Sequence, residues 1–361
     1  MKTMDNYELL PGERFPAGRL APERAEIEAI LADYGVRDLS GIKLLDTTRD
    51  ASDIRLNYIV DKKVVLRFAN APGMSEQRLE ELNRLIGRYA DMGLRCPKFL
   101  LHPDGKFLHP WSDMQYYLSE YIDLSVADEV EIEDESRLME EVADSVAGFA
   151  EKYRNVDLSE TMGMYSLFEQ SPLDKEAGID EKEDNFRELV KCLRDLSQDA
   201  LAERLEKKNT SIREKLKAVY GKLPRCVFQG DENFTNVLVD AGQHFAGFID
   251  FNLAGTEVIV NQLANLAGFD YDEENKAPEG ASNRLAHGIA YYQAHAGRML
   301  RIYHAVPLER QAMAWYAWIV MAAQWPTVCF FRDGLSREPL RDEILELLSL
   351  IADLPEDALT V

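Results

Sequence analysis

The spacing of apolar residues changes several times within the first 122 residues. Helical spacing over residues 21–34 ends at Gly35, and a second helical pattern over residues 74–92 ends at Gly93. Between and after these helices, short alternating or apolar runs predict strands at residues 41–45, 54–60, 63–68, 98–101 and 116–122. Asp61 and Lys62 predict the turn between the second and third strands. This part of the chain is therefore predicted to be β-rich and mostly antiparallel, with an inserted helix.

From residue 123 onward the apolar residues recur mainly at helical intervals. The predicted helices cover residues 137–153, 182–206, 210–220, 283–305, 308–331 and 340–350. The exception is residues 226–251, where β runs at 237–239 and 245–251 flank a turn. We therefore predict an α+β fold of two regions: residues 1–122, β-rich with a polar tail over 1–20, and residues 123–361, larger and mainly helical.

Composition narrows the range of partners. The 361 residues include 41 Lys and Arg against 64 Asp and Glu, for a net charge of −23. Such a surface repels phosphate backbones and anionic lipids, so we expect neither nucleic acid nor a membrane as a partner. No apolar run approaches the roughly 20 residues that span a bilayer, and the start of the chain lacks a signal-peptide core. Four scattered cysteines without a CxxC pair indicate reduced thiols and a cytoplasmic location.

The candidate chemistry lies between residues 228 and 252. Asp231 is predicted in a loop, Asn236 follows five positions later at the start of an apolar strand, and Asp250 ends the next strand. Phosphoryl transfer requires a carboxylate that orients and deprotonates the acceptor hydroxyl, together with oxygen ligands for Mg²⁺. Asp231, Asn236 and Asp250 offer these oxygens. An Asx-rich turn in a hairpin is the simpler alternative, but it does not explain the whole pattern.

This pattern resembles the catalytic and metal-binding loops of the aminoglycoside phosphotransferase and choline kinase-type small-molecule kinases, which share a protein-kinase-like, two-lobed fold. Their His-Gly-Asp-x-x-x-x-Asn motif, followed by Ile-Asp-Phe or Ile-Asp-Trp, corresponds here to residues 229–236 and 249–251. The resemblance covers roughly residues 40–330. It implies that Asp231 is the catalytic base and that Asn236 and Asp250 hold magnesium.

The resemblance also implies a nucleotide site in the first region. Arg67 corresponds to the strand residue that contacts the nucleotide phosphates, and Glu81 is the candidate helix residue that pairs with it. Ser52, with Thr48 as the other option, would contact phosphate from the loop at 47–53. The backbone near Glu120 and Ile122 would meet the adenine edge at a hinge between lobes. A solvated strand arginine is the simpler explanation of Arg67.

Three features depart from the family pattern. Gln229 stands where the family usually has histidine, although a glutamine side chain can still form hydrogen bonds to the loop. The loop at 47–53 contains no glycine. Residues 261–264 read Asn-Gln-Leu-Ala where the family commonly has Asp-Leu-Ala, which removes a charge without an evident partner.

We therefore expect a magnesium-dependent kinase that transfers phosphate from ATP or GTP to a hydroxyl of a small-molecule acceptor. Ten carboxylates within residues 123–144 and five within 268–279 would suit a cationic acceptor, such as an amino sugar or amino alcohol, although solvated loops and helix faces explain them more simply. A nucleotide-binding pseudokinase or regulatory module is the alternative function. A protein kinase is disfavoured because no glycine-rich loop is found.

Overall fold

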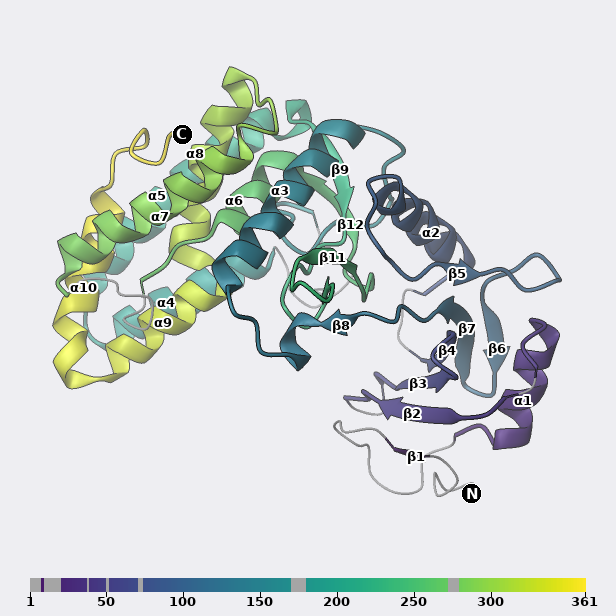
Figure 1. Ribbon diagram of the computed structural model, residues 1–361. Coiled ribbons are helices and arrows are strands. Elements are labelled where there is room, and N and C mark those ends of the chain that lie inside the picture. The colour runs from purple at the N-terminus through teal and green to yellow at the C-terminus, as the bar shows by residue number, and fades with distance from the viewer. Residues whose placement is uncertain are drawn as a thin grey trace. The chain divides into compact units, whose positions relative to one another are not determined.

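A computed structural model of the protein describes residues 8–9, 21–37, 39–49, 52–70, 74–169, 180–271 and 279–361. The chain divides into two compact units (Figure 1). The β unit comprises residues 1–132 and 233–249, and the helical unit comprises residues 133–232 and 250–361. The predicted tail at residues 1–20 lies outside the described residues, except for the two residues of strand β1.

The β unit is built on one sheet. Its strands are β1 (Glu8–Leu9), β2 (Ile42–Asp46), β3 (Arg55–Val60), β4 (Val64–Ala69), β5 (Phe99–Leu100), β6 (His109–Trp111) and β7 (Met114–Glu120). They lie in the order β1-β2-β3-β4-β7-β5, and β6 also pairs with β7. Every pairing is antiparallel except that of β1 with β2. The predicted antiparallel character of the sheet is thus confirmed.

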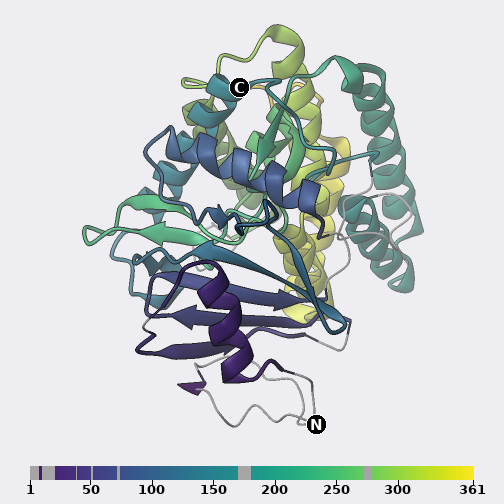
Figure 2. The same cartoon turned by 90° about the vertical axis from the view of Figure 1, so that its right-hand side faces the viewer.

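Alternating burial along the strands gives the sheet its apolar face. Leu56, Tyr58, Leu66 and Phe68 are fully buried on β3 and β4, whereas the residues between them are half-buried. Helix α1 (Arg24–Asp33) lies across this face and buries Ile27 and others against it (Figure 2). The core of the β unit is therefore a helix packed on a pleated surface.

The predicted turn between β3 and β4 forms as a tight hairpin. Asp61 and Lys62 have φ values of 50° and 53°, and the N–H of Lys63 donates to the carbonyl of Val60 at 2.9 Å. Two consecutive residues with positive φ are what a type I′ turn requires, and its twist matches that of the strands. This turn sets the register in which Arg67 lies opposite Asn57 on β3.

Two further elements complete the β unit. Helix α2 (Glu76–Ala90) is capped by the Ser75 side chain, which accepts a hydrogen bond from the Arg78 N–H. The hairpin of β10 (Val237–Val239) and β11 (Phe245–Phe248) pairs with β8 (Ser125–Val126), which precedes the short helix η1 (Ala127–Glu129). The sequence predicts this hairpin in the second region, from residue 123 onward, whereas its pairing with β8 joins it to the β unit.

The helical unit contains eight α-helices among its described residues. They are α3 (Glu135–Tyr153), α4 (Glu181–Asp195), α5 (Asp199–Val219), α6 (Ile259–Ala267), α7 (Ala281–Met299), α8 (Pro307–Ala323), α9 (Trp325–Ser336) and α10 (Glu338–Asp353). A short helix, η2 (Tyr220–Lys222), follows α5. Strands β9 (Arg225–Phe228) and β12 (Gly255–Val258) pair antiparallel in this unit. The predicted α+β class, an antiparallel β part and a larger helical part, is therefore confirmed.

Two predicted helices are each divided in the structure. The pattern over residues 182–206 breaks after α4, where Ser197 has a φ of 59° and the Gln198 N–H donates to the carbonyl of Leu193. The pattern over residues 308–331 breaks at Gln324, whose ψ of 143° is extended and which precedes Pro326 in the first turn of α9. Neither break interrupts the run of apolar residues, and in α8 every residue from Ala312 to Ala323 is buried, so the apolar pattern does not mark where the helix ends.

Several short elements were not predicted: β6, β8, β9, β12 and α6. Strands of two to four residues are too short to show alternation, and β12 is buried at all four positions. All four cysteines are free thiols, as expected from their scattered positions. None of the described helices is both long enough and apolar enough to cross a membrane.

Candidate phosphoryl-transfer site

Gln229 joins the two predicted catalytic loops within the helical unit. It follows β9 directly and is completely buried. Its Oε1 accepts a hydrogen bond from the Asp231 N–H at 2.7 Å, and its Nε2 donates to the backbone carbonyl of Asp250, also at 2.7 Å. One amide side chain thus uses both an acceptor and a donor to hold the two loops together. The residue that departs from the family pattern therefore has a defined structural role.

We refer to the two hydrogen bonds of the Gln229 side chain as the Gln229 clamp. The backbone on either side of this clamp, at Gly230 and Asp250, adopts left-handed conformations. Gly230 has a φ of 85°, and a Cβ added there would lie 2.8 Å from the carbonyl oxygen of Leu253. Asp250 has a φ of 51°, which few residues other than glycine adopt, and its Oδ1 accepts the Asn252 N–H at 3.2 Å. Backbone in such sparsely populated regions is concentrated at functional sites.

Asn236 lies in the β unit, at the start of the β10–β11 hairpin. Its N–H donates to the carbonyl of Asn233 and its carbonyl accepts the Ile249 N–H, each at 2.9 Å. The residue is 6% exposed. The chain therefore leaves the helical unit just after Asp231, passes Asn236 and returns at Asp250. Side-chain oxygens of Asn236 and Asp250 are of the hard type that Mg²⁺ prefers, so the donor chemistry fits this metal.

Glu232 supports the loop from behind, a role that sequence analysis missed. Its side chain accepts hydrogen bonds from the Gly230 N–H at 3.3 Å and from Nε2 of Gln262 on α6 at 2.9 and 3.0 Å. Burial is the main cause that raises the pKa of Glu232 to about 7. Gln262 belongs to the Asn-Gln-Leu-Ala segment that replaces the family's Asp-Leu-Ala. In this protein the carboxylate, Glu232, lies on the loop, and the amide that donates to it, Gln262, lies on the helix.

Arg67 lies in the middle of β4, between Asn57 of β3 and Tyr117 of β7. It is half-buried and points to the face of the sheet opposite the core that α1 covers. Glu81 lies on α2, where its Oε2 is 3.8 Å from Nη1 of Arg78 and both side chains are 9% exposed. Burial lowers the pKa of Arg78 to about 10. The pairing of Arg67 with Glu81 stays a prediction.

The two candidate phosphate contacts in the loop at 47–53 differ in their surroundings. Ser52 is exposed, whereas Thr48 is 3% exposed and its Oγ1 accepts the Arg55 N–H at 3.0 Å. Thr48 thus helps to shape the loop, and Ser52 is the more accessible hydroxyl. Residues 50 and 51 of this loop lie outside the described residues.

The predicted hinge follows β7. Glu120 is the last residue of that strand and pairs with Val64 of β4. Its N–H donates to the carbonyl of Lys98 at 2.9 Å, and its Oε2 accepts the Lys98 N–H at 3.1 Å. The carbonyl of Ile122 accepts the Leu124 N–H at 2.9 Å. Glu120 is therefore held to Lys98 by two hydrogen bonds, whereas the bond at Ile122 is local to the segment. Recognition of the base by this segment stays a prediction.

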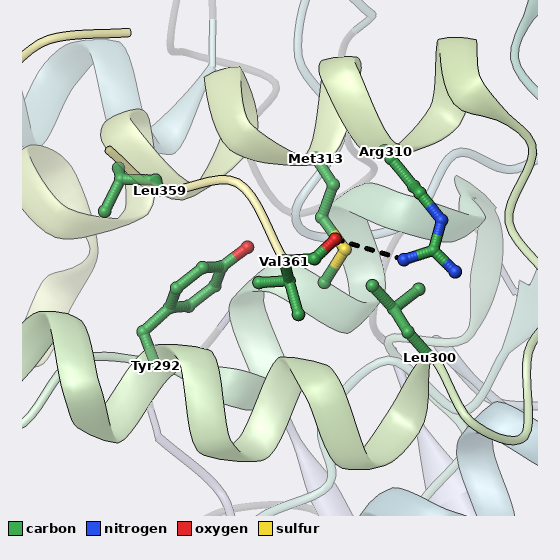
Figure 3. Close-up of a pocket in the computed structure, with 6 residues that line it drawn as sticks. All are labelled: Tyr292, Leu300, Arg310, Met313, Leu359 and Val361. Carbon is green, nitrogen blue, oxygen red and sulfur yellow. Dashed lines mark hydrogen bonds between the residues drawn. The ribbon is translucent and has the colours of Figure 1, made fainter. Parts of the chain in front are cut away.

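Several of the acidic residues within 123–144 form contacts in the helical unit. Asp134 caps α3 through the Arg137 N–H, and Glu140 and Asp144 both pair with Arg298 on α7. Of the second acidic segment, Asp272, Glu273 and Glu274 lie outside the described residues. A small hollow in the helical unit contains none of the predicted site residues (Figure 3). It is closed by the C-terminal Val361, whose backbone oxygen accepts a hydrogen bond from Arg310 at 3.0 Å.

Comparisons with known proteins agree with the motif. The sequence pattern described as the phosphotransferase enzyme family matches residues 47–297, more than half of the chain. A search of curated proteins finds no match.

Similar solved structures include an amicoumacin kinase in complex with AMP-PNP, Ca²⁺ and its ligand, at 11% identity and a TM-score of 0.48, with 85% of this chain and 88% of the other covered. A spectinomycin phosphotransferase with ADP and spectinomycin shows 10% identity and a TM-score of 0.47, with 93% and 100% covered. A microcompartment-associated aminopropanol kinase shows 11% identity and a TM-score of 0.46, with 93% and 98% covered. The family pattern includes both loops that Gln229 joins, and on that match the chain belongs to the phosphotransferase enzyme family.

Proposed function

We propose that this protein transfers the γ-phosphate of ATP or GTP to a hydroxyl group of a small-molecule acceptor. The observation that carries the proposal is the Gln229 side chain, which holds the Asp231 and Asp250 loops together through two hydrogen bonds of 2.7 Å. Such a clamp fixes the base-bearing loop relative to the carboxylate that would bind metal. Positioning and electrostatics supply most of the rate enhancement in phosphoryl transfer.

In this proposal Asp231 acts as the catalytic base. Its carboxylate orients the acceptor hydroxyl and takes up the proton as the oxygen bonds to the γ-phosphorus and the β,γ-bridging oxygen departs with the nucleoside diphosphate. Asn236 and Asp250 would hold Mg²⁺, which neutralises phosphate charge when bound. Arg67 would bind the non-transferred phosphates with its guanidinium group.

The remaining predicted residues would hold the nucleotide. Ser52 would donate its hydroxyl to a phosphate, Glu81 would orient Arg67, and the backbone at Glu120 and Ile122 would recognise the base. The net charge of −23 opposes binding of a nucleotide, so these local contacts must overcome the field of the whole chain. The same charge favours a cationic acceptor, such as an amino sugar or amino alcohol.

The test is a nucleotide-consumption screen with ATP and GTP against amino sugars, amino alcohols, amino acids and neutral sugars. Asp231→Asn is expected to lower turnover by about 10²–10⁴-fold while leaving nucleotide binding unchanged. Asp240→Asn makes the same chemical change in the exposed β10–β11 turn and should have no effect. Equal turnover in Asp231→Asn and wild type would refute the assignment of the base.

The acceptor panel separates the alternatives. A wild-type protein that binds nucleotide but phosphorylates no acceptor would favour the nucleotide-binding module. A preference for amine-bearing acceptors over neutral analogues, lost at high ionic strength, would support the cationic acceptor, because salt screens attraction between exposed charges.

A further inference from the structure

A compact group of imidazole and carboxylate side chains lies in the connection between β5 and β6, which can be followed in Figure 1. The turn begins at His102, whose N–H donates to the carbonyl of Lys106 and whose carbonyl accepts the Gly105 N–H, both at 2.9 Å. Gly105 has a φ of 87°, and Oδ1 of Asp104 accepts the Lys106 N–H at 3.0 Å. This turn folds His102 and Asp104 back toward His109, the first residue of β6.

Ligand atoms of three side chains converge at this point. Nδ1 of His102 lies 2.9 Å from Oδ1 of Asp104, and Nε2 of His109 lies 3.1 Å from Oδ2 of the same carboxylate. All three side chains offer ligand atoms within 4.8 Å of one another. The two imidazole rings are 4.6 Å apart between centroids. The sequence His-Pro-Asp-Gly-Lys-Phe-Leu-His thus brings two nitrogens and one carboxylate together within eight residues.

Without a metal, these contacts are hydrogen bonds. The tautomers with the proton on Nδ1 of His102 and on Nε2 of His109 let both neutral rings donate to the Asp104 carboxylate, at 2.9 and 3.1 Å. The same atoms are also metal ligands once those two nitrogens give up their protons, because each then offers a lone pair beside a carboxylate oxygen.

Aromatic packing holds the two imidazoles in place. Tyr34, which follows α1, contacts His102 edge-on at 4.9 Å, and Tyr116 of β7 stacks on His109 at 5.3 Å with an interplanar angle of 22°. The His102 and His109 side chains are 18% and 12% exposed, whereas Asp104 is 45% exposed. The nitrogens are therefore fixed, and the open side at Asp104 leaves room for water ligands.

The geometry points to a transition-metal site: we propose that His102, Asp104 and His109 bind a divalent ion of the Zn²⁺, Co²⁺ or Ni²⁺ class. Bonds of about 2.0–2.2 Å to nitrogen and carboxylate oxygen place neighbouring ligand atoms about 3.3 Å apart in a tetrahedron. The two nitrogen–oxygen separations, 2.9 and 3.1 Å to the two oxygens of one carboxylate, are a few tenths of an ångström shorter than this value, so a small outward movement of the side chains would admit the ion. Imidazole ligands favour these metals over Mg²⁺, which prefers an all-oxygen shell. The site is therefore chemically distinct from the magnesium ligands proposed for catalysis.

The test is calorimetric titration of the metal-stripped full-length protein with ZnCl₂ in the presence of excess MgCl₂. We expect one tight Zn²⁺ equivalent per chain, with affinity reduced about tenfold or more in His109→Gln and in Asp104→Asn. His295→Gln, which changes another histidine on α7, is the matched control and should bind like wild type. Asp104→Asn alters a solvent-exposed loop side chain, so its fold should persist, which circular dichroism would verify.

A measurement on the unmodified protein keeps the proposal independent of variant stability. Zn²⁺ should shift the imidazole proton resonances of His102 and His109 among the six histidines, and leave the other four unchanged. Absence of saturable binding in excess MgCl₂ would overturn the proposal. So would undiminished Zn²⁺ affinity in Asp104→Asn and His109→Gln, or resonance shifts confined to other histidines.

Discussion

Replacing Gln229 by methionine should remove the two hydrogen bonds that join the Asp231 and Asp250 loops while changing the side-chain volume little. Methionine has a similar volume and an unbranched side chain, so Gln229→Met removes both hydrogen bonds without leaving a large cavity. The Asp231 N–H and the Asp250 carbonyl then each lose a partner at 2.7 Å, next to a side-chain position that is completely buried. The effect is therefore specific to the contact between the two loops.

The expected magnitude follows from those two groups. A buried donor or acceptor left without a partner costs about 1–3 kcal/mol, so Gln229→Met should lower the free energy of unfolding by about 2–6 kcal/mol. Turnover should also fall, because the Asp231 carboxylate loses its fixed position. Gln229→His should retain most activity, because one imidazole nitrogen can donate while the other accepts.

Urea unfolding followed by tryptophan fluorescence measures the first effect. Three of the four tryptophans, Trp315, Trp318 and Trp325, lie in the helical unit, so the signal reports mainly on the part that contains Gln229. Gln311→Met, at an exposed position of α8, is the matched control and should change stability by less than about 0.5 kcal/mol. If Gln229→Met left both stability and turnover at wild-type values, the clamp would have no energetic significance.

Three further predictions concern the helical unit. Gly230→Ala should cost about 1–3 kcal/mol of stability, because its φ is 85° and the added methyl would meet the carbonyl oxygen of Leu253 at 2.8 Å; urea unfolding measures this. Glu232 has a pKa raised to about 7 from 4.5, so its contribution to stability is complete below pH 4.5 and declines as pH rises to 7. Glu232→Gln should therefore gain up to about 3 kcal/mol relative to wild type between pH 4.5 and 7.5, measured by urea unfolding at both values. Arg213→Met should cost about 3–5 kcal/mol, measured as a loss of unfolding free energy, because it leaves the carboxylate of Asp180 buried without the bonds at 2.7 and 3.0 Å.

Two of these predictions have a matched control variant, and the third is checked by its pH dependence. Gly221→Ala adds a methyl group in open space and should be tolerated, so equal losses at Gly221 and Gly230 would contradict the steric argument. A pH-independent difference between Glu232→Gln and wild type would contradict the raised pKa of the carboxyl. Arg332→Met removes an exposed ion pair with Glu188 and should cost no more than about 1 kcal/mol. An Arg213→Met loss of similar size would show that burial adds nothing to that pair.

Much of the β unit and of the candidate site could be predicted from local sequence. The turn at Asp61 and Lys62 and the strands beside it form as expected, because alternation and turn chemistry are local properties. The loop spacing from Asp231 through Asn236 to Asp250 likewise identifies the family, because the order of oxygen-bearing residues along the chain is itself the motif.

Other features depend on contacts between distant parts of the chain. The helix boundaries at Ser197 and Gln324 were missed because apolar periodicity continues through each break, and β12 was missed because all its positions are buried. The partner of Gln262 could not be found from sequence, because Glu232 lies 30 positions earlier and meets it only after α6 packs behind the loop.

The sequence by itself determined which chemical groups this protein carries, in which order, and which local elements present them. The tertiary structure alone decided which of those groups meet: Gln229 with Asp250, Glu232 with Gln262, and Tyr34 with His102. The physical reason is the distance along the sequence over which each kind of interaction acts. Turn conformation and strand alternation depend on neighbouring residues, whereas a hydrogen bond between distant residues exists only after burial has brought their elements together and excluded water.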